Sequence, residues 1–432
     1  METEVKKGEA AAMQEELVNS ICENVGTPFY AYDYENIRKN FAELKNSLPD
    51  NANLCYSIKA NPSFAICQII SGLTSKAEAS SLGEMYCALN AGFKSENIVL
   101  SGPGKTLECI AFALREGIGI SVESIEEIQL ISELCFALNQ YADIIIRINP
   151  NFSSKRSGIS MCGLPSQFGI DYTELESAVS VIRQLQRVNL VGLSIYLSSQ
   201  ILDAETIIEN THSMLKVFIC FQETYHIKVN LLDFGGGFGI SYYNDICLDL
   251  KVLKNGLSKL FKEYENEIAD KQIIFESGRY IMAESGSFFT KILYKKKSGN
   301  KNYLICDGGF NNVLISAFFT REIRGNFPMD VVSKKIRLAD ANPEEYCICG
   351  PLCSPRDILG SKVLLPSVDT GDILEIKKLG AYGFTYSPLF FLSNDIPAEV
   401  IIKGDRYYVI RKRMRGADLL DGQAGLPEEL FI

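Results

Sequence analysis

The chain of 432 residues is long enough for two domains, or for one large barrel with an attached domain. Its 47% hydrophobic and 22% charged residues are ordinary for a globular protein and exclude extensive disorder. The net charge of −10, from 53 acidic against 43 basic residues, argues against a general nucleic-acid surface and a polybasic membrane patch.

The 13 cysteines are odd in number and follow no disulfide framework, which predicts reduced thiols in a cytoplasmic protein. Cys347, Cys349 and Cys353 cluster, but the two histidines, His212 and His226, lie far from them in sequence, so we predict no metal site. The first seven residues are charged and contain no apolar run, so we expect no secretory signal. No apolar stretch has the length of a membrane span, and we expect a soluble protein.

From Thr27 onward, after a polar leader, short apolar strands alternate with amphipathic helical stretches. The predicted strands are Phe29–Tyr32, Leu54–Ile58, Ile98–Ser101, Ile118–Val122, Ile144–Ile148, Leu190–Tyr196, Leu231–Phe234 and Ile273–Glu276. Predicted helices include Tyr34–Ser47, Leu82–Ala91 and Ile125–Leu138. Seven or eight such units predict an α/β fold with a (β/α)8 TIM-like barrel rather than an open sheet.

After about residue 285 the pattern changes to strands with few helices between them. The predicted strands are Ser287–Tyr294, Tyr303–Asp307, Ile373–Lys377, Ala398–Ile402 and Arg406–Arg411. We therefore predict three parts: a leader at 1–26 that packs partly on the β domain, a barrel at 27–285, and a C-terminal β-rich barrel or sandwich at 286–432.

Lys59 lies at the end of the apolar strand Leu54–Ile58, just before Asn61-Pro62. Burying a lysine cation is costly, so its amine is expected to be paired or used. A lysine with a lowered pKa can form a Schiff base with an aldehyde. The alternative is a lysine that extends to solvent at a strand end.

Two further polar segments follow predicted strands. Gly235, Gly236 and Gly237 allow backbone N–H groups to approach a ligand such as phosphate, although a mobile turn is the alternative. Glu276, followed by Gly278 and Arg279, could hold a ring cation and an anion side by side. An internal pair between this glutamate and arginine is the alternative.

Alternation places Ser194, Tyr196 and Ser198 on one face of their strand, toward a barrel lumen or a cofactor, or simply in the core. In the β-rich region, the segment Cys353–Asp357 contains a thiol, a cation and a carboxylate. Tyr382 stands between small residues. Each of the last two segments could also be an ordinary turn.

Taken in order, five motifs resemble those of the fold-type III pyridoxal-phosphate decarboxylases, which include diaminopimelate, ornithine and arginine decarboxylases. The motifs are Tyr56-Ser57-Ile58-Lys59-Ala60-Asn61, Glu78-Ala79-Ser80-Ser81-Leu82-Gly83-Glu84, Gly235-Gly236-Gly237-Phe238, Glu276-Ser277-Gly278-Arg279 and Gly380-Ala381-Tyr382. The resemblance extends from about Thr27 to Arg411.

The resemblance implies a homodimer with shared active sites and pyridoxal 5′-phosphate as cofactor. Lys59 would bind the cofactor as a Schiff base, and Glu276 would face its pyridine nitrogen. The phosphate would be surrounded by Ser199, Gly235, Gly236, Gly237, Gly278, Arg279 and Tyr382. The shell around the ring and the lysine would be Glu78, Ser80, Glu84 and Arg147. Cys353, as proton donor to the product carbanion, and Asp357, as a substrate-binding residue, would come from the partner chain.

Two departures point away from a simple diaminopimelate decarboxylase. Ser194 and Tyr196 stand where the family has a stacking histidine motif, and Tyr196 can stack through its ring. Ser354 replaces the glutamate that reads a distal amine, while Arg356 brings a cation.

A closer resemblance is to the branch that acts on conjugated amino acids. Arg321, Arg324 and Arg356 would bind extra carboxylates, although dimer salt bridges are the alternative. We predict α-decarboxylation of a carboxylate-bearing conjugate such as N-citrylornithine in siderophore biosynthesis. The alternatives are a decarboxylase of glutamyl groups on an acyl carrier protein, which would then be a partner, a diaminopimelate or ornithine decarboxylase, and an amino-acid racemase.

Overall fold

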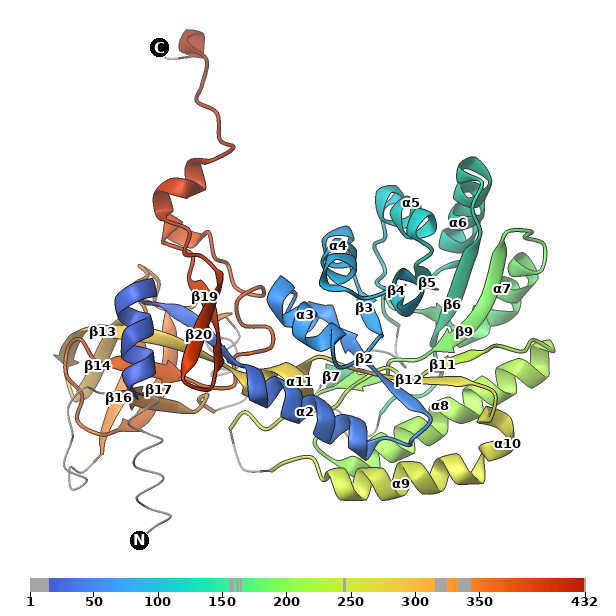
Figure 1. Cartoon of the computed structure of the whole chain (residues 1–432), viewed down its shortest axis with the longest axis horizontal. Helices are drawn as coiled ribbons and strands as arrows, with labels where there is room; N and C mark the ends of the chain where they lie inside the picture. The colour runs from blue at the N-terminus through green and yellow to red at the C-terminus, as the bar shows by residue number, and fades with distance from the viewer. Residues whose placement is uncertain are drawn as a thin grey trace. The chain divides into compact units, whose positions relative to one another are not determined.

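The structure is a computed structural model that describes residues 15–154, 159–160, 163, 165–243, 246–314, 325–332 and 343–430. It divides into two compact units (Figure 1). One unit comprises Glu35–Ala283. The other combines Met1–Tyr34 with Glu284–Ile432.

The unit Glu35–Ala283 is built on a closed barrel of eight parallel strands. In spatial order these are β5, β4, β3, β2, β12, β11, β9 and β6, and pairing of β5 with β6 closes the ring. Their bounds are β2 Ala52–Ser57, β3 Ala77–Ala79, β4 Ile98–Leu100, β5 Gly119–Val122, β6 Ala142–Asn149, β9 Val188–Ser194, β11 Leu231–Asp233 and β12 Gln272–Ser277. Short strands β7 (Ile159–Ser160), β8 (Ile170–Asp171) and β10 (Ser198–Ser199) lie beside the barrel: β8 pairs with β6, and β7 with β10. The prediction of a TIM-like barrel is confirmed.

Helices alternate with these strands and lie on their outer side (Figure 1). Several begin at a serine, threonine or aspartate whose side chain accepts a backbone N–H of the first turn, as at Ser81, Thr106 and Asp203. The helices are α2 Tyr34–Ser47, α3 Phe64–Ser71, α4 Leu82–Ala91, α5 Leu107–Glu116, α6 Ile125–Leu138, α7 Leu175–Ile182, α8 Ala204–Tyr225, α9 Leu250–Glu263, α10 Glu265–Ile268 and α11 Arg279–Met282. The short 3₁₀ turns are η1 Ile58–Ala60, η2 Ser95–Asn97, η3 Tyr172–Glu174, η4 Ala283–Ser285, η5 Phe391–Ser393, η6 Gly416–Leu420 and η7 Glu428–Leu430.

Strand β6 shows why the barrel sequence reads as continuous apolar runs. Ile144 and Ile146 are fully buried on one face of the strand, and Ile145 and Arg147 are buried on the other. A barrel strand is covered by helices outside and by side chains inside, so both faces exclude water. Arg147 is therefore a charge held inside an apolar framework, and it requires a partner.

The second unit is built around a nine-stranded mixed sheet. Its main path is β17, β16, β14, β13, β1, β19 and β20, and β18 pairs with β13 and β15. The bounds are β1 Phe29–Asp33, β13 Gly286–Ser298, β14 Lys301–Cys306, β15 Met329–Val332, β16 Glu344–Cys349, β17 Ile358–Leu365, β18 Ile373–Ile376, β19 Ala398–Lys403 and β20 Arg406–Arg411.

Strand β1 does not belong to the barrel, where the sequence pattern had assigned Phe29–Tyr32. It pairs antiparallel with β13 and parallel with β19. Helical residues 15–25 contribute Val18 and Ile21 to its core, and Phe29 stacks on Phe289 with ring centroids 4.8 Å apart. The eighth barrel strand is β3, whose three residues are too short to produce a recognisable alternation.

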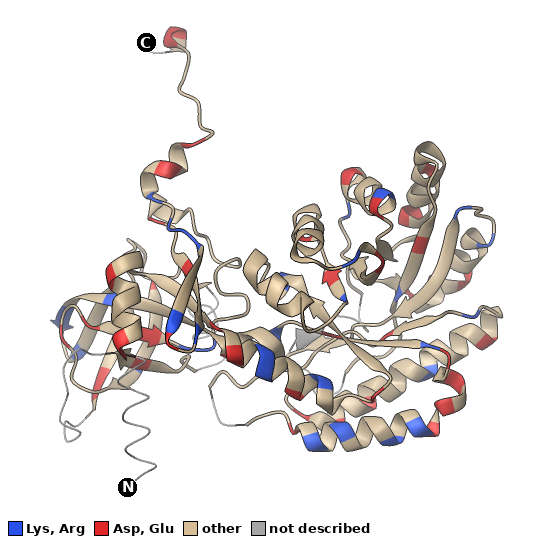
Figure 2. Ribbon diagram, viewed as in Figure 1, with Lys and Arg blue, Asp and Glu red and all other residues tan. Residues whose placement is uncertain are grey.

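Lys and Arg residues are interspersed with Asp and Glu residues along the ribbon of the described residues, for example along α2 (Figure 2). Lys39 and Glu43 form an i,i+4 pair there, with N and O 4.0 Å apart. Among the helices that the structure describes, none is long and apolar enough to cross a membrane.

Candidate active site

Lys59 lies on η1, immediately after barrel strand β2, and pairs with Glu78 of β3. Its Nζ donates to both carboxylate oxygens at 2.8 Å. The lysine side chain is 37% exposed, whereas that of Glu78 is only 6% exposed. Lys59 is therefore both accessible to solvent and paired with a buried acid. The sequence had left open whether its amine is paired or extends to solvent, and the structure shows both.

Glu78 is held as a carboxylate. Burial alone would raise its pKa, but the Lys59 charge and hydrogen bonds from Lys59, Ser101 and Ser57 outweigh burial and lower the pKa to about 2. Ser101 donates to Glu78 Oε1 and lies 3.3 Å from the Ser80 hydroxyl. The ionised acid keeps the Lys59 amine at one place on the barrel rim.

Glu84 orders the chain that follows Glu78. Its carboxylate accepts the Ser80 backbone N–H at 2.7 Å, and its own N–H donates to Oγ of Ser81, the N-cap of α4. Burial raises the pKa of Glu84, with the nearby Glu78 charge acting in the same direction. Ser80 and Glu84 thus support the turn below Lys59 and Glu78.

The glycine-rich loop after β11 makes a cradle that only glycine can form. Gly235 and Gly237 have φ of +58° and +112°. A Cβ on Gly235 would lie 2.7 Å from Tyr196 Cδ2, and one on Gly237 would lie 2.6 Å from the Ser198 carbonyl oxygen. Among the described residues, the N–H groups of Gly236 and Gly237 donate no hydrogen bond. Two such N–H groups in a glycine loop suit an anion.

Two buried hydroxyls lie close to this loop in sequence or space. Within the described residues, Ser198 Oγ and Ser277 Oγ have no hydrogen-bond partner. Such an unsatisfied buried hydroxyl is costly unless a ligand or water completes it. Gly278 follows Ser277 and packs against the lysine turn, since its Cβ would lie 2.5 Å from Ala60 Cβ.

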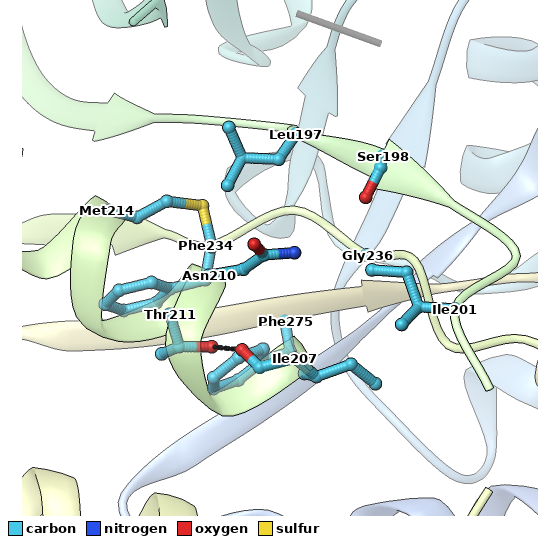
Figure 3. A pocket seen from close by; sticks show the side chains of 10 residues that line it. All are labelled: Leu197, Ser198, Ile201, Ile207, Asn210, Thr211, Met214, Phe234, Gly236 and Phe275. Atoms are coloured by element: carbon cyan, nitrogen blue, oxygen red, sulfur yellow. Dashed lines mark hydrogen bonds between the residues drawn. The ribbon is translucent and has the colours of Figure 1, made fainter. Parts of the chain in front are cut away.

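A small pocket behind the loop is lined by Ser198 and Gly236 (Figure 3). Most of its wall is apolar, including Phe234 and Phe275, whose rings stack with centroids 5.3 Å apart. These aromatic rings support the loop from behind. The other lining residues are Leu197, Ile201, Ile207, Asn210, Thr211 and Met214.

Glu276 and Asp233 form a carboxyl pair on neighbouring strands β12 and β11. The side chains are hydrogen bonded to each other, and Asp233 also accepts the Gly235 N–H at 2.8 Å. Burial raises the pKa of Asp233 to about 6. Burial and the neighbouring charges of Asp233 and Glu78 raise the pKa of Glu276 well above its usual range. Glu276 is only partly buried, so a ligand in the barrel mouth can reach it.

Arg147 on β6 forms an ion pair with the buried Glu123, which directly follows the neighbouring strand β5. Its Nη1 donates to Glu123 Oε1 at 3.1 Å, and its guanidinium lies 4.8 Å from the centre of the Phe168 ring. Glu123 also accepts the N–H groups of Gly102 and Gly169, each at 3.0 Å. Glu123 therefore links Arg147 to the backbone at Gly102 and Gly169.

Tyr196 lies between β9 and β10, with its ring centre 5.9 Å from Lys59 Nζ. It replaces the histidine expected by resemblance, and its ring also covers Gly235. Ser199 lies on the adjoining β10, and Arg279 begins α11 and donates to the Tyr242 hydroxyl at 3.0 Å. These barrel residues converge on the rim where Lys59 stands.

The remaining predicted residues lie in the other unit. Asp357 is buried and accepts the N–H groups of Phe310 and Leu352, both at 2.8 Å. Its carboxylate fixes the loop from Gly350, whereas Cys353 and Arg356 on that loop are exposed. Tyr382 adopts a φ of +56°. Arg321 and Arg324 lie outside the described residues.

The sequence reasoning assigned no role to Asp233, Ser101 or Glu123. Asp233 carried a usable signal, because it ends an apolar strand directly before the glycine triplet. Ser101 and Glu123 acquire their partners only through neighbouring strands, 23 and 24 residues away in sequence, and a single sequence does not reveal such contacts.

The family model "Pyridoxal-dependent decarboxylase, pyridoxal binding domain" matches residues 34–283. The chain is 32% identical to the L-glutamyl-[BtrI acyl-carrier protein] decarboxylase of Niallia circulans over 418 residues, covering 96% of this chain and 98% of that protein. It is 31% identical to diaminopimelate decarboxylase of Archaeoglobus fulgidus over 419 residues, covering 96% of each. This chain belongs to the pyridoxal-dependent decarboxylases.

Solved structures of this family share the fold. Diaminopimelate decarboxylase of Helicobacter pylori complexed with L-lysine has a TM-score of 0.83 at 31% identity, covering 94% of this chain and 98% of that one. The enzyme of M. jannaschii has a TM-score of 0.86 at 27% identity, covering 95% of each. The predictions of the family, the fold, a decarboxylase and pyridoxal phosphate as cofactor are confirmed.

The described residues fit this cofactor. Its aldehyde requires an amine, its ring nitrogen an acid, and its phosphate a set of donors. Lys59 offers an amine and Glu276 offers a carboxyl group at the ends of barrel strands. Among the described residues, the N–H groups of Gly236 and Gly237 and the hydroxyls of Ser198 and Ser277 have no partner, and such donors suit the phosphate.

Proposed function

We propose that this decarboxylase removes the α-carboxyl group of an amino acid whose side chain is extended by a conjugate bearing a carboxylate, such as N-citrylornithine. The observation that supports this proposal is the loop Cys353–Asp357. It displays Arg356 at the surface and carries a serine, rather than an acid, next to the thiol. An exposed guanidinium suits a carboxylate, and the loop offers no acid for a distal ammonium between Cys353 and Asp357.

In this proposal the barrel residues hold the cofactor in one orientation. Lys59 would bind its aldehyde carbon, and Glu276 would face the ring nitrogen. The N–H groups of Gly236 and Gly237, with Arg279, would bind the phosphate. When bound, pyridoxal phosphate supplies an electron-accepting ring for the negative charge left by departing carbon dioxide.

The loop residues act on the substrate side. Cys353 would carry the proton that replaces the lost carboxyl group, because a thiol can transfer a proton near neutral pH. Arg356 would bind the distal carboxylate, and Asp357 would position both through its two backbone hydrogen bonds. Following the family resemblance, we propose that a homodimer forms and that the partner chain contributes this loop.

A glutamyl group carried on an acyl carrier protein is the second candidate. The relative from Niallia circulans, which is similar over 96% of this chain, bears that activity in its name. On this alternative an acyl carrier protein would be the partner, and the exposed arginine would meet its acidic surface instead of a citryl carboxylate. With the first candidate function we also propose a cytoplasmic location and a role in siderophore biosynthesis.

A screen for carbon dioxide release separates these substrates. The purified full chain with pyridoxal phosphate is offered ornithine, lysine, diaminopimelate, citryl-ornithine and carrier-bound glutamate. We expect the highest kcat/KM on citryl-ornithine. Preference for carrier-bound glutamate would establish the second candidate, and preference for free diaminopimelate would refute both.

A further inference from the structure

The carboxyl pair of Asp233 and Glu276 is held by the backbone of two neighbouring strands. Asp233 ends β11, and the Glu276 N–H donates to the Gly235 carbonyl at 2.7 Å. The two side chains are joined by a hydrogen bond. A carboxylate only accepts hydrogen bonds, so two carboxyl groups can share one only if one of them carries a proton.

The backbone hydrogen bond that Asp233 accepts favours its ionised form, which places that proton on Glu276. Asp233 already accepts the Gly235 N–H at 2.8 Å, and the hydrogen bond from Glu276 is a second bond that it accepts. The pair therefore consists of an ionised aspartate and a protonated glutamic acid. Burial raises the pKa of both groups. The pKa of Asp233 rises to about 6, and that of Glu276 rises well above its usual range.

Charged groups on several neighbouring elements of the barrel act on the pair. Two groups, Glu78 and Asp233, oppose ionisation of Glu276, while Lys59 favours it. Arg147 on β6 favours ionisation of Asp233. Cys55 on β2 lies opposite Glu276 in the strand register, and burial raises the pKa of its thiol so that it stays neutral. Three carboxyl groups thus meet near one lysine, and a proton on Glu276 reduces their repulsion.

We propose that Asp233 is a positioning residue that holds one proton on Glu276 until pyridoxal phosphate binds. The inference rests on the proposed role of Glu276 at the ring nitrogen. On binding, the Glu276 O–H bond breaks and its electron pair stays on the carboxylate. The proton goes to the ring nitrogen when that nitrogen arrives unprotonated, and to solvent when it arrives protonated. Either way, Glu276 then faces the ring cation as an anion.

This proposal predicts that the wild type and the Asp233→Asn variant differ by one in the number of protons that they exchange when the ligand binds. In Asp233→Asn, the amide can donate a hydrogen bond to Glu276 and the neighbouring negative charge is gone, so Glu276 ionises before binding. Binding by the wild type should then take up one proton fewer, or release one more, than binding by Asp233→Asn. The ratio of the dissociation constants, wild type over variant, should fall about tenfold for each unit of pH increase while Glu276 of the wild type stays protonated.

The experiment uses the full-length protein after removal of cofactor, and pyridoxine 5′-phosphate as ligand. This ligand has the ring and the phosphate but no aldehyde, so Lys59 chemistry does not contribute. Titration calorimetry in two buffers of different ionisation heat gives the number of protons exchanged. Asp143→Asn is the matched control, because Asp143 is an exposed barrel-strand aspartate that pairs with Asn189. It should exchange protons as the wild type does.

A second measurement needs no variant at Asp233. Infrared difference spectra of the wild type should show loss of one carboxylic-acid C=O band when pyridoxine 5′-phosphate binds, and Glu276→Gln should lack that change. Equal proton exchange in wild type and Asp233→Asn, or an unchanged acid band in the wild type, would overturn the inference. Normal ligand binding with either of these results leaves the proposed decarboxylase function intact, which carbon dioxide release tests separately.

Discussion

The two regions predicted to carry chemistry hold their charged groups in different ways. At the barrel rim, acids and bases are locked into pairs, such as Lys59 with Glu78 and Arg147 with Glu123, and at least one member of each pair is buried. On the loop after β16, Cys353 and Arg356 are exposed, whereas the Asp357 side chain is buried and hydrogen bonded.

This difference separates a preformed site from an adjustable one. Buried pairs are costly to rearrange, so the barrel residues present one fixed geometry to a cofactor. Exposed side chains on an anchored loop can be exchanged at little cost to folding, which suits residues that select a substrate. Changes in the barrel should therefore affect every substrate, and changes on the loop should affect some.

Lys59→Ala should have the largest effect. Removing the amine abolishes covalent attachment of the cofactor, so the visible absorbance of the Schiff base should disappear and carbon dioxide release should fall by at least about 1,000-fold on every substrate. The exposed Lys39 on α2 provides the control Lys39→Ala, which should keep both signals. A coloured, active Lys59→Ala protein would break the idea of a fixed barrel site.

The Glu78 pair predicts an acid-sensitive barrel in the cofactor-free protein. The folded pKa of Glu78 is about 2 against an ordinary 4.5, so its stabilisation is present above about pH 4.5 and is lost as pH falls toward 2. That shift corresponds to about 3 kcal/mol of unfolding free energy. Denaturant unfolding across this pH range should show a steeper loss for the wild type than for Glu78→Gln. Parallel curves would mean that the pair contributes nothing.

How much of the structure the sequence predicts depends on how far apart in the sequence the contacting residues lie. Lys59, Gly235–Gly237 and Glu276 follow apolar strands, and a parallel barrel brings strand ends together, so their meeting at one rim could be foreseen. Strand β1 could not be assigned, because an apolar alternation does not state which sheet it joins. The short strand β3 gives too few residues for a pattern.

The pairing of Asp233 with Glu276 was equally hidden in the sequence. It depends on the register of β11 against β12, in which Asp233 lies opposite Ile274 and thus two residues from Glu276. The anchoring role of Asp357 was hidden as well, since its partners Phe310 and Leu352 are backbone groups that any residue supplies. Residue types indicated which chemical groups gather at the rim, whereas contacts between distant segments determine how those groups are paired.

Cys353→Ala sharpens the comparison at the loop. Loss of a proton donor should slow product formation about 100-fold and divert part of the turnover to transamination, because the carbanion is protonated at another carbon. Cofactor absorbance should stay unchanged, since the rim is intact. Cys220→Ala, at another exposed cysteine, is the control. Wild-type rate and products in Cys353→Ala would remove the thiol from the reaction.

Arg356→Ala should give the smallest effect and the most selective one. A charge-assisted bond to a distal carboxylate is worth about 1.5–3 kcal/mol, so kcat/KM on citryl-ornithine should fall by about tenfold to 100-fold. Ornithine lacks that carboxylate, and its kcat/KM should change by less than about twofold. Arg406→Ala removes another exposed arginine, on β20, and should alter neither substrate. An equal loss on both substrates would mean that Arg356 supports the loop as Asp357 does, and specificity would then have to come from residues other than this guanidinium.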